Sequence, residues 1–382
     1  MKNRDSYWMG LALELASRGR GHVEPNPMVG CVIVDNNELI ASGYHGVFGG
    51  PHAEVEAMSK CDPKRICQST LYVTLEPCSH FGKTPPCVDL LVRHRPKRVV
   101  IAMTDPFPAV AGRGVELLRQ HAIDVEIGVL STRSHELNAP YLKLLSCGMP
   151  WVIAKWAMTL DGVLATRDGD SKWISNEQSR RVVHKLRSRV DAVIVGIGTA
   201  IADDPLLNAR LESAEAPARI ATRIVMDRQG RLPLDSKLVK SARQGPVLIA
   251  VSERADIDRV NKLNDAGCGT LVIPQEEESK SFGFVLTELG RRRQTNVLLE
   301  GGGTLLGSAF DANLIDQVEC FIAPKLVGGA NSQRPLGGFG KSLMCQATNL
   351  KSPRVTCLGS DVHVSGVVEH VDYSAHHAPL NA

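Results

Sequence analysis

The feature that most restricts the fold of this chain is an alternation of strand-like apolar runs with amphipathic runs, which occurs twice along its 382 residues. In the first half, a helix is predicted over residues 6–18, and two strand-like runs follow, joined at Asn36-Asn37 as in a hairpin. Helices are predicted from about residues 53 and 87 and over 114–122, with strands at 69–77, 98–103 and 124–129. This alternation predicts an α/β sandwich with a mixed or parallel sheet.

A second alternation begins near residue 151. Strands are predicted at 151–158, 191–199, 218–227, 245–251, 269–274 and 296–302, with a helix at 176–189 between the first two. The segment SCGMPW, residues 146–151, contains glycine and proline and separates the two sets. We therefore expect one domain over residues 1–147, a second over 150–370, and a disordered tail over 371–382.

The composition favours a globular protein of the cytosol. The net charge of +3 does not suggest a nucleic-acid binder, and no apolar run approaches the roughly 20 residues that span a bilayer. The first ten residues do not resemble a signal peptide. Ten cysteines spread thinly over the chain suit a reducing compartment, where disulfides are rare. We expect a cytoplasmic protein with no membrane or nucleic-acid partner.

A possible metal site combines His52 with Cys78 and Cys87. His52 and Glu54 stand at the start of a predicted helix, and each cysteine lies next to proline. One histidine and two cysteines supply three ligands for a tetrahedral zinc ion and leave its fourth position open, as in catalytic sites. Glu54 could then move a proton without binding the metal. The alternative is that Glu54 and Glu56 are helix-start charges and His52 is a surface residue.

The order of these residues matches the H-x-E … P-C … C pattern of zinc-dependent nucleobase deaminases. The usual cysteine spacing in that pattern is P-C-x-x-C, whereas eight residues separate Cys78 from Cys87 here. His80 lies inside this insertion and is a rival ligand. We prefer the set that contains His52 and both cysteines, because it completes the pattern.

The segment LLEGGGTLLG, residues 298–307, predicts a strand that runs through glycines into a helix. Exposed backbone N–H groups at such a helix start suit a pyrophosphate. The spacing is not G-x-G-x-x-G, so the segment alone is weak evidence. A tight turn that needs positive φ explains it equally well.

Several segments resemble the bifunctional riboflavin-biosynthesis deaminase/reductase family. The first half carries PNPMVGCVIV, GPHAEVEA and PCSHFGKTPPC, and the second carries KWAMTLDG, GDSKWIS, GIGTAIADDPLLNAR and APKLVGG in the family's order. The resemblance implies an N-terminal cytidine-deaminase-like α/β/α sandwich and a C-terminal domain similar to dihydrofolate reductase. It also implies one zinc ion per chain, NADPH, and a free pyrimidine ribosylamino 5-phosphate as substrate. We separately expect a homo-oligomer.

The resemblance also assigns residues. Beside His52, Glu54, Cys78 and Cys87, it suggests three substrate contacts in the deaminase, namely Asn26, His45 and Lys83. The nicotinamide nucleotide is expected to contact Ala157, Trp173, Thr199, Asp203, Arg228, Gly302, Gly303, Thr304 and Leu305. The reductase substrate is expected to contact Ser171, Arg187, Leu207, Arg210 and Glu300, and Lys155 as a further candidate. Arg228 departs from the small polar residue that family members often carry, and the two substrate arginines suit a phosphate group.

Two other functions fit part of the pattern. One is a nucleic-acid deaminase fused to an unrelated domain, which the low net charge and the second-half segments disfavour. The other is a non-enzymatic protein with a closed structural zinc site and a nucleotide-sensing domain. A fourth protein ligand to zinc would favour this non-enzymatic function.

Overall fold

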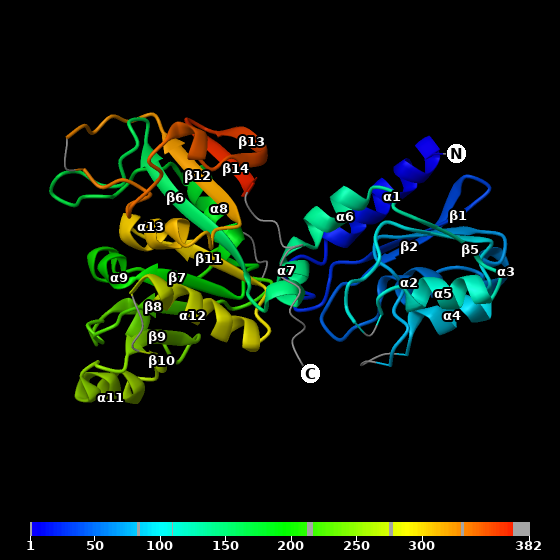
Figure 1. Ribbon diagram of the computed structural model, residues 1–382, viewed down its shortest axis with the longest axis horizontal. Helices are drawn as coiled ribbons and strands as arrows, with labels where there is room; N and C mark the ends of the chain where they lie inside the picture. Colours follow the sequence, from blue (N-terminus) through cyan, green and yellow to red (C-terminus); the bar gives the residue numbers. More distant parts are fainter. Residues whose placement is uncertain are drawn as a thin grey trace. The chain divides into compact units, whose positions relative to one another are not determined.

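The structure is a computed structural model that describes residues 2–81, 85–108, 110–211, 217–274, 278–329 and 332–369. The chain forms two compact units, Met1–Leu145 and Ser146–Ala382, which are described separately (Figure 1). The tail expected over 371–382 lies outside the described residues. In the described ranges, none of the helices is both long and apolar enough to cross a bilayer.

The first unit contains a five-stranded sheet in the order β2-β1-β3-β4-β5. The strands are β1 (Gly30–Asp35), β2 (Glu38–Tyr44), β3 (Thr70–Val73), β4 (Arg98–Ile101) and β5 (Asp124–Ile127). β1 is antiparallel to both β2 and β3, whereas β3, β4 and β5 are parallel. Asn36 and Asn37, between β1 and β2, have φ of 47° and 66°. Positive φ at both positions is what a two-residue hairpin turn requires, so the predicted hairpin is confirmed.

Helices cover both faces of this sheet because its central strands are apolar on both sides. Val32 and Val34 of β1 pack with α1 (Lys2–Ser17), while Cys31 and Ile33 pack on the opposite face. That opposite face carries α2 (Ala53–Met58), α4 (Cys87–His94) and α5 (Arg113–Gln120), and the unit also contains α3 (Pro63–Ile66), α6 (Ser131–Leu137) and α7 (Ala139–Cys147). The first unit is therefore an α/β/α sandwich. The sequence interpretation did not include α6 and α7.

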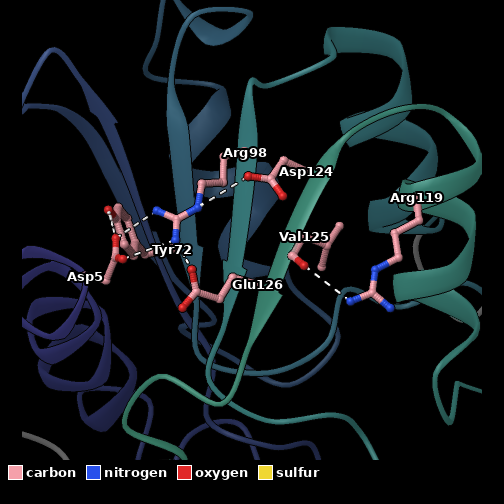
Figure 2. A network of polar contacts seen from close by, with 7 residues as sticks. All are labelled: Asp5, Tyr72, Arg98, Arg119, Asp124, Val125 and Glu126. Atoms are coloured by element: carbon pink, nitrogen blue, oxygen red, sulfur yellow. Dashed lines mark hydrogen bonds and ion pairs between the residues drawn. The ribbon is translucent and has the colours of Figure 1, made fainter. Parts of the chain in front are cut away.

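A polar network ties α1 to the sheet (Figure 2). Arg98 of β4 donates to both carboxylate oxygens of Asp5 on α1, at 2.9 and 3.1 Å, and forms an ion pair with Glu126 of β5. The hydroxyl of Tyr72 on β3 donates to Asp5 at 2.7 Å. Burial alone would raise the pKa of Asp5, but the hydrogen bonds from Arg98 and Tyr72 outweigh it and lower that pKa. Asp5 is thus a buried carboxylate that accepts hydrogen bonds from side chains of β3 and β4.

The second unit contains a nine-stranded sheet in the order β10-β9-β8-β7-β11-β6-β12-β14-β13 (Figure 1). The seven strands from β10 to β12 are parallel, and β14 and β13 continue the sheet in antiparallel pairing. The strands are β6 (Trp151–Thr159), β7 (Ala192–Gly196), β8 (Thr222–Met226), β9 (Val247–Ser252), β10 (Gly269–Ile273), β11 (Asn296–Glu300), β12 (Gln317–Ala323), β13 (Leu350–Leu358) and β14 (Asp361–Val368).

Two groups of helices flank this second sheet. Phe282 and Leu286 of α12 (Glu278–Arg291) and Leu306 of α13 (Gly303–Asp311) pack on Val297 and Leu299 of β11. The intervening Leu298 and Glu300 face the other side, where α8 (Glu177–Arg187) contacts Glu300. The unit also contains α9 (Ile197–Asp203), α10 (Lys237–Lys240), α11 (Ile257–Asp265) and a 3₁₀ turn at Met344–Gln346.

One predicted strand needs correction. The strand expected over 191–199 ends at Gly196, and α9 begins at Ile197. The apolar run continues across this junction, so hydrophobicity alone does not mark the change from strand to helix. The sequence interpretation also lacked β12, β13, β14 and α12.

Candidate active sites

The first site gathers His52, Cys78 and Cys87 from three separate segments. His52 is the residue before α2, Cys78 follows β3, and Cys87 is the first residue of α4. Nδ1 of His52 lies 3.3 Å from Sγ of Cys87 and 3.5 Å from Sγ of Cys78. All three donor atoms lie within 4.8 Å of one another, close enough to bind one ion together. A nitrogen and two sulfurs form a donor set that suits zinc.

Hydrogen bonding prepares one of the two cysteines to bind a metal. The main-chain N–H of Cys87 points to Sγ of Cys78 at 3.3 Å. The Cys87 thiol and His52 also donate to Cys78, and together these contacts lower the pKa of Cys78 well below that of a free thiol. The pKa of Cys87 is raised by its hydrogen bond to Cys78 and by burial. Cys78 is therefore the thiolate of the pair, and Cys87 must release its proton when a metal binds.

Glu54 lies beside this group and is not part of it. It is the second residue of α2, and only 3% of its surface is exposed. Burial, followed by the negative charge of Cys78, raises the pKa of Glu54 to about 7. A carboxyl group with such a pKa can both accept and donate a proton near neutral pH.

His45 and Asn26, two predicted substrate contacts, are joined to each other next to the zinc-ligand group. Nδ1 of His45 lies 2.9 Å from the carbonyl of Pro51, which can only accept, so Nδ1 carries the proton. Nε2 of His45 then accepts from the amide of Asn26 at 3.3 Å. Burial lowers the pKa of His45, which keeps the ring neutral. The ring centroids of His45 and His52 are 5.5 Å apart.

Two predicted residues, Lys83 and His80, lie in the segment between Cys78 and Cys87. Lys83 lies outside the described residues. His80, the rival ligand, is not part of the group formed by His52, Cys78 and Cys87. Its ring lies 5.6 Å from that of Phe107, and its Nδ1 is buried without a hydrogen-bond partner among the described residues.

Glu76 is a site residue that the sequence interpretation missed. It lies two residues before Cys78, is buried, and accepts hydrogen bonds from four main-chain N–H groups between 2.9 and 3.2 Å, those of Asp105, Gly112, Gly114 and Val115. A Cβ on Gly114 would lie 2.3 Å from the carbonyl of Pro77, so glycine is required there. Glu76 thus ties the segment that leads into Cys78 to Asp105 and to the start of α5. Only tertiary contacts reveal this role, since an acid before Pro-Cys has no distinctive pattern.

In the second unit, Arg187, Glu300 and Lys155 form one charged cluster. Glu300 of β11 lies beside Lys155 of β6 in the parallel ladder. Arg187 donates from Nε and Nη2 to the two carboxylate oxygens of Glu300, at 2.6 and 2.8 Å. Burial would raise the pKa of Glu300, but the charge of Arg187 outweighs it and lowers that pKa. Burial lowers the pKa of Lys155, and the negative charge of Glu300 partly offsets this decrease. Arg187 is thus already engaged by a carboxylate.

Arg210 has a different environment from Arg187. It follows Leu207, which is buried with φ of 54°, in the segment after α9. Its main-chain N–H donates to Nδ1 of His184 at 3.3 Å. Its guanidinium is exposed and makes no hydrogen bond or ion pair within the described part of the chain. Arg210 is therefore an available cation, whereas the interpretation from sequence treated both arginines alike.

Direct contacts join only some of the residues expected at the nucleotide. The N–H of Gly302 donates to Oγ1 of Thr199 at 3.0 Å, and Gly302 precedes α13, whose first residues are Gly303, Thr304 and Leu305. A Cβ on Gly303 would lie 2.2 Å from the carbonyl of Arg334, so this turn needs glycine for a close approach. The alternative explanation, a positive φ, does not hold at Gly302, whose φ is −71°.

The remaining predicted residues lie on surrounding segments. Ser171 donates to Asp203 at 3.2 Å, which joins a substrate candidate to a nucleotide candidate. Trp173 is 68% exposed, and the guanidinium of Arg180 lies 4.8 Å from its ring centroid. Ala157 lies on β6, and Arg228 follows β8 and donates to Ser281 at 3.2 Å.

Comparison with known proteins identifies both units. The cytidine and deoxycytidylate deaminase zinc-binding region matches residues 2–103, and the RibD C-terminal domain matches residues 150–364. Riboflavin biosynthesis protein RibD of Actinobacillus pleuropneumoniae is 41% identical over 365 residues, which cover 95% of each chain. The chain belongs to the RibD family. RibD of Escherichia coli strain K12 is 36% identical and covers 94% of this chain and 98% of its own.

Solved structures of the RibD family agree over the full length. Acinetobacter baumannii RibD, form 1, has a TM-score of 0.85 at 37% identity and covers 97% of this chain and 100% of its own. A deaminase/reductase from Thermotoga maritima has a TM-score of 0.82 at 33% identity and covers 96% and 99%. The expected fold class and family are therefore confirmed. The chain is a deaminase and reductase of riboflavin biosynthesis with a zinc-binding region, and its reductase unit implies a nicotinamide cofactor.

Proposed function

We propose that the first unit hydrolytically deaminates 2,5-diamino-6-ribosylamino-4(3H)-pyrimidinone 5′-phosphate and that the second unit reduces the ribosyl group of the product to ribityl with NADPH. The final product is 5-amino-6-(5-phosphoribitylamino)uracil. The T. maritima relative is described as a diaminohydroxyphosphoribosylaminopyrimidine deaminase and 5-amino-6-(5-phosphoribosylamino)uracil reductase. The observation that carries the proposal is the group His52, Cys78 and Cys87 beside the buried carboxyl of Glu54.

One zinc ion per chain is proposed at this group. Its three donors leave the fourth position of a tetrahedral ion open, which is the arrangement of a catalytic site rather than a closed structural one. A bound zinc ion would supply a Lewis acid that lowers the pKa of water toward neutrality. The structure offers no fourth protein ligand within that group among the described residues.

Glu54 is the proposed proton carrier of the deamination. With a pKa of about 7, it can accept the proton of the attacking water and pass a proton to the departing amino group. Water adds to the ring carbon, the carbon–nitrogen bond breaks, and ammonia leaves. Asn26 and His45, fixed in one hydrogen-bonded arrangement, are proposed to orient the pyrimidine, and Lys83 is proposed to contact the same substrate.

Arg210 is the proposed phosphate contact of the reductase. Its exposed guanidinium can bind phosphate oxygens with two parallel hydrogen bonds. Arg187 holds Glu300 and thereby orients that carboxylate beside Lys155. Ser171 and Leu207 complete the proposed substrate contacts.

NADPH is the proposed nucleotide of the second unit. Its contacts are proposed at Ala157, Trp173, Thr199, Asp203, Arg228 and the turn Gly302–Leu305. Main-chain N–H groups at the start of α13 suit a phosphate. The hydride chemistry belongs to the cofactor, so these residues position C4 of nicotinamide against the acceptor carbon.

The test is an assay of the purified full-length protein on the pathway pyrimidine, with and without NADPH, with all products resolved by mass. We expect ammonia release in both cases and the ribityl product only with NADPH. Metal analysis should give about one zinc per chain, and Cys78→Ser should lose both the metal and ammonia release. Deamination by a metal-free wild type would show that the proposed mechanism is wrong.

We further propose a cytosolic homo-oligomer with no nucleic-acid or membrane partner. Support for self-association comes from β13, an outer strand of the nine-stranded sheet whose residues are almost all exposed. An open strand edge can pair with another copy of the chain. Light scattering on the purified protein at several concentrations would test this, and a monomer throughout would contradict it.

A further inference from the structure

His184 and Arg187 connect α8 to the segment that carries Arg210. The two side chains lie three residues apart on α8 and therefore on the same face of the helix. Nη1 of Arg187 donates to the carbonyl of Asn208 at 3.4 Å, and the main-chain N–H of Arg210 donates to Nδ1 of His184 at 3.3 Å. These contacts hold the segment on both sides of residue 209.

The backbone of this segment needs such contacts. Asp204 and Leu207 have φ of 41° and 54°, in the left-handed region that non-glycine residues rarely adopt. Such residues keep this conformation only when their surroundings impose it. Leu207 is held by its own burial, whereas Arg210 is exposed and has its main-chain contact with His184.

The contact with Arg210 depends on a neutral His184. A main-chain N–H can only donate, so Nδ1 of His184 must carry a lone pair and the proton of the neutral ring lies on Nε2. Burial lowers the pKa of His184, and the positive charges of Arg187 and Arg210 add to this effect. The Asn208 carbonyl and Glu300 act in the opposite direction without reversing it. The ring is therefore neutral at pH 7.

We propose that His184 is a positioning residue of the reductase, which places Arg210 by accepting the hydrogen bond from its main-chain N–H. The inference rests on the proposed role of Arg210 as the phosphate contact. Because His184 holds its main chain while the guanidinium stays available, the backbone of Arg210 is in place before the substrate arrives. Without His184, binding must also order the segment. That cost applies to the ground state and the transition state alike, so it appears in KM.

The test uses full-length His184→Ala with the deaminated intermediate supplied directly and NADPH oxidation as the readout. We expect KM to rise about 3- to 10-fold, the effect of one hydrogen bond, with kcat within about twofold of the wild type. His184→Asn should keep KM near that of the wild type, because Oδ1 of asparagine can replace Nδ1 as acceptor. Lys185→Ala, at the exposed neighbouring position on α8, is the matched control and should change neither constant.

A double-mutant cycle with Arg210→Ala separates this inference from the proposed function. If His184 acts through Arg210, then His184→Ala should have almost no further effect on KM in the Arg210→Ala background. If Arg210→Ala raises KM but His184→Ala does not, or if the two effects add, then the role of His184 is wrong and that of Arg210 stands. If Arg210→Ala leaves KM unchanged, then the proposed phosphate role of Arg210 is wrong. The proposed positioning role of His184 is then wrong as well. Equal thermal unfolding of the variants is the control for folding.

Discussion

Two glutamates on α2 show how position decides the role of a side chain. Glu54 is buried beside the zinc-ligand group, whereas Glu56 is partly exposed and forms an ion pair with Lys60 at 2.6 Å. Both lie in the first turn of α2, where acids are favoured by the helix dipole. The sequence alternative, a simple helix-start charge, therefore describes Glu56 and not the buried Glu54.

Glu54→Gln should lower deamination by about 10²- to 10⁴-fold, because glutamine keeps the shape but cannot accept the proton. Zinc content should stay unchanged, since Glu54 is not among the three grouped donors. Glu56→Gln is the matched control and should stay within about threefold of the wild type. The measurement is ammonia release together with metal analysis. A Glu54→Gln enzyme as active as the Glu56→Gln enzyme would contradict the role of Glu54.

Arg210→Ala should raise the KM of the reductase for the supplied intermediate and leave deamination unchanged. A charge-assisted hydrogen bond contributes roughly 1.5–3 kcal/mol, so kcat/KM should fall about ten- to hundredfold. Arg187→Ala should behave differently, because it leaves the buried Glu300 without its partner and should also lower the stability of the second unit. Thermal unfolding of both variants checks this difference, and equal losses of stability would contradict it.

At the scale of elements, α1 is held to the sheet of the first unit by Arg98 (Figure 2). Arg98→Ala should destabilise α1 and β4 by about 3–5 kcal/mol, because it leaves the carboxylate of Asp5 buried without its cation. Arg119→Ala is the control, since Arg119 is exposed and, among the described residues, its side chain donates a single hydrogen bond, to the carbonyl of Val125 at 3.3 Å. It should cost no more than about 0.5 kcal/mol. Amide hydrogen exchange in the full-length protein measures the loss of stability in each of the two variants.

The effect of Arg98→Ala should depend on pH. The folded pKa of Asp5 lies below its ordinary value of about 3.9. The ion pair therefore contributes fully above that value and is lost as the pH falls through the folded pKa. The difference in stability between the wild type and Arg98→Ala should shrink on acidification, because a protonated Asp5 no longer needs its cation, and it should be smallest below the folded pKa of Asp5 in the wild type. A difference that stays constant at low pH would show that Arg98 acts through packing alone.

At the scale of the whole molecule, the two activities belong to two compact units, each with its own sheet. The deaminase residues lie within residues 26–87 and the reductase residues within 155–305. Glu54→Gln should therefore still reduce the supplied intermediate at the wild-type rate, and Arg210→Ala should release ammonia at the wild-type rate. Ammonia release and NADPH oxidation, measured on the same preparations, check this separation. If Glu54→Gln abolished reduction in a folded protein, a single shared active site would have to replace the two-site arrangement.

Local patterns of the sequence were sufficient for much of this protein. The alternation of apolar and amphipathic runs predicted the α/β class, and Asn36-Asn37 predicted the hairpin because few residues tolerate positive φ. The order of His52, Glu54, Cys78 and Cys87 pointed to the deaminase. These features depend on neighbours in the chain or on motif spacing, so the sequence contains them directly.

Tertiary structure decided what depends on residues far apart in the chain. The strands β12, β13 and β14 gave no clear pattern, and β13 is exposed along most of its length, so it shows no alternation of buried and exposed residues. The sequence alone does not distinguish Arg187 from Arg210. In the structure Arg187 is paired with Glu300, 113 positions away, whereas the guanidinium of Arg210 is available to a ligand. The role of Glu76 likewise depends on N–H groups 29 to 39 positions away. Burial and pairing of charges are properties of the folded chain, and no local pattern encodes them.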